Sequence, residues 1–179
     1  MEVIVIDNFL PSTLFENIEN SIVFNRNFPL YFQKNVSHDV SLNCDLNQGS
    51  LWNWYASHII YNYNEDSPDS ISEWFPNIFE TFIPRIKSVQ DIDSLLRIKT
   101  NFYPHTETLR EHGKHVDYDF ACRGAIYSLN TCNGFTRFED GTKIDSVANR
   151  MIFFNAGKLH NSSTTTDQMG RYNINFNYL

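Results

Sequence analysis

The closing stretch "RYNINFNYL", residues 171–179, alternates between apolar and polar side chains almost without a break. Its even-numbered positions are aromatic or aliphatic up to residue 178, whereas Arg171, Asn173, Asn175 and Asn177 are polar. Such alternation predicts a β-strand with one apolar face. The polar face has two interpretations. By default it faces water, but three amides and a guanidinium without Lys or Glu also fit the lining of a polar cavity, in which case the apolar face packs on the N-terminal helices.

The second half of the chain contains further strand patterns. Residues 95–103, 123–132 and 151–156 are short segments rich in β-branched and aromatic side chains, and each is predicted to be a strand. Residues 134–147 predict two short strands around the tight-turn pair Asp140-Gly141.

The first half of the chain contains both strand and helix patterns. Residues 2–9 predict a strand that ends at Asn8, and Leu14, Phe15, Ile18 and Ile22 follow at helical spacing. Residues 51–63 and 71–89 are also interpreted as helical, the latter interrupted by Pro76 and Pro84. Residues 33–50 and 64–73 are polar loops, either ordinary surface loops or a lid.

Together these patterns predict one domain over residues 1–179, mainly β with N-terminal helices, as a sandwich or jelly roll. Residues 1–90 would form a helical supporting layer with an N-terminal strand. Residues 91–179 would form the β core that carries the functional site.

Composition narrows the function classes. The formal net charge of −7 argues against a nucleic-acid partner or an anionic membrane surface. No long apolar run predicts a membrane span, and the N-terminus lacks the positive region of a signal peptide, so we expect a cytoplasmic protein. Cys44, Cys122 and Cys132 are odd in number and form no CxxC pair, which favours reduced cysteines buried as small core residues.

The segment "HGKHVDYDF", residues 112–120, is the candidate metal motif. In an extended chain, His115 and Asp117 point to the same side. His160, after the strand at 151–156, can supply a third ligand. Two imidazoles and one carboxylate on one face of an iron ion leave positions open for substrate and oxygen. Alone, however, a His-x-Asp tripeptide is weak support, and a structural role is the default.

Other polar and aromatic residues were weighed against this set. His112 competes with His115, but its odd offset from Asp117 places it on the opposite face of a strand. Asp119 is better suited to solvent or to a place behind the ligands. The remaining histidines lack partners at useful spacing, and the tryptophans fit a core better than a substrate platform; these residues are His38, His58, His105, Trp52, Trp54 and Trp74.

From Ile98 to the C-terminus, the sequence resembles the 2-oxoglutarate- and Fe(II)-dependent dioxygenases of the prolyl-4-hydroxylase-like branch. The matching pieces follow in the family's order, and they are Phe102-Tyr103-Pro104, His115-Val116-Asp117, Ile126-Tyr127-Ser128-Leu129-Asn130, Asn133-Gly134, the stretch 149–154, His160 and Arg171. The N-terminal VIDNFLP is also similar to the start of such proteins, and the short length and ending resemble phage-encoded members, which would act in the host cytoplasm.

The resemblance implies a double-stranded β-helix, a jelly roll of the cupin type. It implies that His115, Asp117 and His160 bind Fe(II), with 2-oxoglutarate as cosubstrate, molecular oxygen as the second reactant and ascorbate as a candidate reductant. It also implies that Arg171 binds the distal carboxylate of 2-oxoglutarate and that Tyr103 adds a hydrogen bond. Asn173, two residues further on the same face, is a candidate for another.

The implied activity is hydroxylation of a second substrate, with release of succinate and carbon dioxide. The first candidate substrate is a prolyl residue in a peptide or protein, and a small molecule remains open. Three departures from the family pattern affect the pocket: Ser128 replaces a tyrosine, Asn133 replaces a glycine, and the loop from His160 to Arg171 is somewhat long. Two alternative functions remain, a non-catalytic jelly-roll binding module and a cupin-like metalloenzyme of another reaction type.

Overall fold

The computed structural model describes residues 2–34, 36, 52–63 and 70–179. Its elements, in chain order, are β1 (Ile4–Ile6), α1 (Ser12–Ile22), β2 (Tyr31–Gln33), β3 (Tyr55–Asn62), β4 (Ser70–Ile71), α2 (Phe75–Lys87), β5 (Leu95–Pro104), β6 (Arg123–Ser128), β7 (Phe135–Phe138), β8 (Lys143–Asp145), β9 (Arg150–Asn155), β10 (His160–Ser162) and β11 (Gly170–Tyr178).

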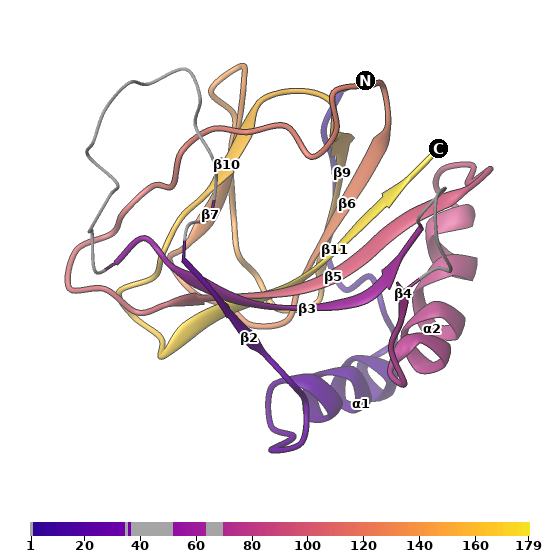
Figure 1. Ribbon diagram of the computed structural model, residues 1–179, viewed down its shortest axis with the longest axis horizontal. Coiled ribbons are helices and arrows are strands. Elements are labelled where there is room, and N and C mark those ends of the chain that lie inside the picture. Colours follow the sequence, from indigo (N-terminus) through magenta and orange to yellow (C-terminus); the bar gives the residue numbers. More distant parts are fainter. Residues whose placement is uncertain (1, 35, 37–51, 64–69) are drawn as a thin grey trace.

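The strands form two antiparallel sheets. The larger has the order β1-β9-β6-β11-β5-β3-β2, with β4 attached to β3, and the smaller has the order β10-β7-β8. In Figure 1, α1 and α2 cover one face of the large sheet, and β7 and β10 lie on its other side. The fold is therefore mainly β with two helices, the predicted jelly-roll class.

The apolar face of β11 packs on the helices, as its alternation predicted. Ile174, Phe176 and Tyr178 are fully buried in one cluster with Ile18 of α1 and Phe82 of α2. The Phe82 and Phe176 ring centroids lie 5.1 Å apart. This layer fixes one side of β11, so the polar side of the strand must face the space between the two sheets.

The expected helix at residues 51–63 is wrong, because Tyr55–Asn62 is strand β3. Tyr55, Ile59 and Tyr61 have aromatic or β-branched side chains that favour strands, and β3 pairs along β5 from Ala56 to Asn62. Residues 1–90 thus supply strands of the main sheet as well as the helical layer.

In residues 71–89, the helix is shorter than the pattern suggested and is not broken by either proline. Pro76 stands in the first turn of α2, where a missing N–H costs little. Pro84 lies inside the helix. The predicted loop at 33–50 lies almost wholly outside the described residues, as do His38 and Cys44. Of the predicted loop at 64–73, residues 70–73 are described, and Ser70–Ile71 form strand β4 instead of a loop.

The other expected strands are confirmed, including β7 and β8 around Asp140-Gly141, where Gly141 has a positive φ of 89°. Cys122 and Cys132 are buried free thiols, as expected. Within the described residues, no helix has the length and apolar character needed to cross a membrane.

Candidate functional site

The three predicted ligands converge in a small cavity between the sheets. His115, Asp117 and His160 each offer a ligand atom, and these atoms all lie within 4.8 Å of one another. His160 begins β10, and its backbone exchanges two 2.9 Å hydrogen bonds with His115. The Asp117 amide donates to Ala156 O at 2.9 Å, beyond the end of β9. Side chains distant in sequence are thereby fixed together by the backbone.

The motif itself does not lie on a regular strand. Between β5 and β6 the chain forms only isolated bridges, one of which joins His115 to His160. The expected strand geometry at 112–117 is therefore wrong. The side chains of His115 and Asp117 nevertheless point to the same place, because their ligand atoms lie close to each other and to His160.

Both imidazoles are oriented through Nδ1. His160 Nδ1 lies 2.9 Å from Lys158 O, and His115 Nδ1 lies 3.4 Å from Gly113 O. A carbonyl can only accept, so the proton is assigned to Nδ1 and Nε2 is left with a lone pair for a metal. Burial and the neighbouring His160 lower the pKa of His115 to about 4, which keeps it neutral at pH 7.

Asp117 is held as a carboxylate by donors from three side chains. Arg97 Nη2 donates to Oδ1 at 3.0 Å, and Asn177 and Asn175 donate to Oδ2 at 2.9 and 3.3 Å. Burial alone would raise the pKa of Asp117, but Arg97 and the other neighbours hold it below its usual range. The site therefore combines one anionic oxygen ligand with two imidazoles, a donor set that suits Fe(II) and similar divalent metals.

The polar face of β11 is buried rather than exposed to solvent, and its two central residues, Asn173 and Asn175, line the cavity, which decides between the two interpretations of the closing strand. All four polar residues are buried, and they pair in register with β5: Arg171 with Tyr103, Asn173 with Asn101, Asn175 with Lys99, and Asn177 with Arg97. The candidate metal ligands lie toward the Asn177 end of this polar ladder, where Asp117 is bound. Arg171 lies at the other end.

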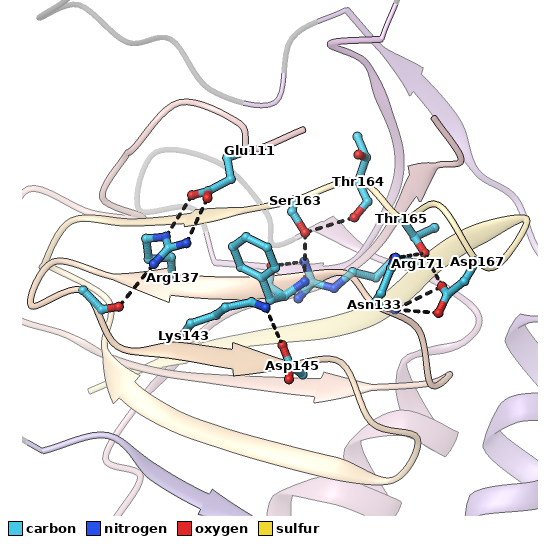
Figure 2. Close-up of polar contacts among 12 residues, drawn as sticks. Glu111, Asn133, Arg137, Lys143, Asp145, Ser163, Thr164, Thr165, Asp167 and Arg171 are labelled. Atoms are coloured by element: carbon cyan, nitrogen blue, oxygen red, sulfur yellow. Dashed lines mark hydrogen bonds and ion pairs between the residues drawn. The ribbon is translucent and has the colours of Figure 1, made fainter. Parts of the chain in front are cut away.

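Arg171 is 1% exposed, yet no carboxylate of the described residues pairs with it. Its Nη1 donates to Phe135 O and its Nη2 to Thr136 Oγ1, each at 2.8 Å, while Nε has no partner. Figure 2 shows this side chain beside the chain that carries Ser163 and Thr164. A guanidinium has five N–H donors, so about three remain for a ligand. A buried, unpaired cation of this kind suits an anion.

Tyr103 and Asn173 flank this guanidinium. Arg171 Cζ lies 5.5 Å from the centroid of the buried Tyr103 ring, and burial raises the pKa of Tyr103, which keeps its hydroxyl protonated. Asn101 donates to Asn173 Oδ1 at 2.9 Å, so the amide nitrogen of Asn173 remains available to a ligand. Tyr103 and Asn173 both line the cavity.

The rejected candidates lie apart from the three ligands. His112 is buried, its Nδ1 is 2.9 Å from Ser162 Oγ, and its ring stacks on Trp52. Burial lowers the pKa of His112 to about 3. Asp119 and His105 are exposed, and His58 contacts Ser72 Oγ at 2.7 Å. Trp74 packs against the main core, and Trp54 stacks toward Phe102.

Two of the departures from the family pattern belong together. The side-chain oxygen of Asn133 accepts hydrogen bonds from Thr165 Oγ1 and from the Thr166 backbone amide, each at 3.0 Å. The backbone amide of Asn133 donates to the Asp167 carboxylate. This cluster, of which Figure 2 shows Asn133, Thr165 and Asp167, ties the long loop between β10 and β11 to the chain before β7. The third departure, Ser128, is fully buried with its Oγ unpartnered, and it does not line the cavity.

Sequence reasoning missed two residues of the site, Lys99 and Arg97, the second of which donates to Asp117. Both lie on β5, whose alternation places Arg97, Lys99, Asn101 and Tyr103 on one face. The signal that could have found them is this second polar face, which matches that of β11. Lys99 lines the cavity, and burial together with the Arg97 charge lowers the pKa of Lys99 to about 8.

Sequence comparison is uninformative, because no family model and no curated protein matches this chain. Solved structures do match. A prolyl hydroxylase from Trichoplax adhaerens, in complex with a hypoxia-inducible factor oxygen degradation domain peptide, is similar at a TM-score of 0.66 and 16% identity, over 99% of this chain and 83% of that one.

Two further matches come from different contexts. The viral collagen prolyl hydroxylase of Paramecium bursaria Chlorella virus-1, in its 2-oxoglutarate complex, gives a TM-score of 0.57 and 13% identity over 100% of this chain and 97% of the other. The α-ketoglutarate-dependent epimerase SnoN of nogalamycin biosynthesis gives a TM-score of 0.66 and 12% identity over 99% of this chain and 77% of the other. The chain therefore has the fold shared by prolyl hydroxylases and other 2-oxoglutarate-dependent non-heme enzymes.

Proposed function

We propose that the protein is an Fe(II)- and 2-oxoglutarate-dependent dioxygenase that hydroxylates a second substrate and releases succinate and carbon dioxide. One observation carries this proposal: a two-histidine, one-carboxylate cluster lines a cavity, and two other lining residues, Tyr103 and Thr136, contact the Arg171 guanidinium, which has no acidic partner among the described residues. The first feature suits the metal, and the second suits the far carboxylate of the cosubstrate.

The residues present fit Fe(II). His115 and His160 would coordinate through Nε2, because Nδ1 of each lies against a backbone carbonyl. Asp117 would supply an oxygen while Arg97 and Asn177 hold its carboxyl plane. Such outer hydrogen bonds orient ligands and conserve metal affinity.

The residues also fit 2-oxoglutarate. Its distal carboxylate would lie against the unused N–H groups of Arg171, with Tyr103 and Asn173 beside it. Arginine offers a planar fork for this purpose, which lysine lacks. The role of the chain is to bind and orient this dicarboxylate along the polar ladder and to exclude water, while the bound metal and cosubstrate supply the oxidative chemistry.

A prolyl residue in a peptide or protein is the first candidate substrate. The motif resemblance supports it, and so does the similarity in fold to prolyl hydroxylases. The same fold in an epimerase shows why fold alone does not select the reaction. The substrate therefore has to be established by direct assay.

The test is succinate formation from 2-oxoglutarate by the Fe(II) protein under oxygen, with ascorbate as reductant and with proline-containing peptides as candidate substrates. We expect succinate formation to depend on Fe(II) and to be lost in Asp117→Ala. A protein that binds metal but consumes no 2-oxoglutarate would favour a binding module or a metalloenzyme of another class.

A further inference from the structure

Lys99 lies beside the metal ligands. It is on β5, in register with Asn175 of β11, and Asn175 donates to Asp117 Oδ2 at 3.3 Å. Lys99 lines the same cavity as His115, Asp117 and His160. A long cationic side chain therefore begins at the level of the metal site, rather than at the Arg171 end of the polar ladder.

This cation has no anionic partner in the described part of the chain. Its closest defined contact is the Tyr55 ring, whose centroid lies 5.4 Å from Nζ. The one carboxylate nearby, Asp117, is already bound by Arg97 and the two asparagines. Tyr55 itself stacks on Tyr103 with the ring centroids 6.0 Å apart, which limits where the lysine can move.

The proposed cosubstrate does not account for Lys99. The keto acid end of 2-oxoglutarate would be bound to the metal, and its far carboxylate would be bound by Arg171. Arg97 is neutralised by Asp117, from which Nη2 lies 3.0 Å away. Lys99, which is partly buried, is left with no counterion among the described residues, and an unpaired cation that is partly removed from water is costly.

We propose that Lys99 binds a carboxylate of the substrate that is hydroxylated, close to the carbon that reacts. This inference rests on the proposed function, and it favours a small carboxylate-bearing substrate over a prolyl residue inside a peptide, whose carboxyl carbon is part of an amide bond. The cavity is lined by Lys99 together with the three candidate metal ligands, so a group bound to the ammonium lies next to the metal site. The Tyr55 ring holds the ammonium in place without neutralising it.

The probe for this site is acetate, with acetamide as its neutral counterpart of the same shape. The protein is loaded with Mn(II) and saturating 2-oxoglutarate, which occupies the metal and Arg171. Each probe is then titrated, and the paramagnetic relaxation of its methyl protons reports binding near the metal. The variants are Lys99→Met and Lys99→Arg, and Lys87→Met, on the exposed end of α2, is the matched control. Thermal unfolding of each variant verifies that it is folded.

We expect saturable binding of acetate but not of acetamide to the wild type and to Lys87→Met. Lys99→Met should weaken acetate binding on the order of tenfold, as expected for the loss of a charged hydrogen-bond donor, and Lys99→Arg should restore most of it. Calorimetry on the same samples should show a much smaller change in 2-oxoglutarate affinity.

Other outcomes overturn the inference in distinguishable ways. Equal acetate binding in wild type and Lys99→Met, with normal 2-oxoglutarate binding, removes the Lys99 assignment alone. A loss of 2-oxoglutarate affinity in Lys99→Met as large as the loss for acetate would assign Lys99 to the cosubstrate. Tighter binding of methylphosphonate than of acetate would assign the site to a phosphoryl group. Failure of the wild type to bind 2-oxoglutarate would overturn the proposed function, and the Lys99 inference with it.

Discussion

Replacing Arg171 by alanine should weaken 2-oxoglutarate binding strongly. Arg171 is 1% exposed, and within the described part of the chain its guanidinium has only two hydrogen bonds, to Phe135 O and Thr136 Oγ1. About three N–H groups are thus free for a carboxylate. Removing one member of a buried charge pair costs about 2–5 kcal/mol. At about 1.4 kcal/mol per factor of ten, the dissociation constant should rise at least tenfold.

The assay is a calorimetric titration of 2-oxoglutarate into the Mn(II) protein. Arg171→Lys should fall between wild type and alanine, because lysine keeps the charge but loses the planar fork. Arg150→Ala is the matched control, since Arg150 pairs with the exposed Asp7 at 2.6 Å and lies outside the cavity. Metal binding should survive in all three variants. Unchanged affinity in Arg171→Ala would refute the assignment of the distal carboxylate site.

Three further predictions concern the ligands and stability. His115→Ala should lose stoichiometric Fe(II), measured by metal analysis, whereas His112→Ala should retain it; the reverse result would reassign the ligand. Asn149, at φ 62°, has side-chain hydrogen bonds with Leu10 N, Leu10 O and Tyr127 Oη. Asn149→Ala should therefore lower the free energy of unfolding, measured in urea, by about 2–4 kcal/mol. A change below about 0.5 kcal/mol would contradict this role. Burial lowers the pKa of His112 to about 3 and of His115 to about 4. The unfolded state therefore binds more protons than the folded state below about pH 6.5. The free energy of unfolding of the metal-free protein should fall by about 2 kcal/mol per imidazole between pH 7 and pH 5. A urea midpoint that does not depend on pH, or a pH dependence of stability that is unchanged in His112→Gln, would refute those pKa shifts.

The strand pattern could be predicted from local sequence, whereas the proposed ligand set needed the family resemblance as well. Alternation in residues 171–179 fixes which side chains share a face. It does not decide whether that face meets water or a cavity, because that depends on the small sheet packed opposite. The spacing of His115, Asp117 and His160 was weak support on its own, and their convergence depends on backbone bonds that no local pattern encodes.

The residues that were missed depend on register. Arg97 reaches Asp117, and Lys99 lies beside Asn175, only because β5 pairs with β11 in one register across more than 70 positions of sequence. The strand at Tyr55–Asn62 was missed for a related reason, since its pairing with β5 outweighs an ambiguous local pattern.

The central claim is that this cluster binds Fe(II) and that 2-oxoglutarate binds next to it. The most direct measurement is the metal-to-ligand charge-transfer absorption when 2-oxoglutarate is added anaerobically to the Fe(II) protein. We expect a band that saturates at one Fe(II) per chain and that is absent in His160→Ala and Asp117→Ala. Absence of the band in the wild type, or an unchanged band in either variant, would contradict the account.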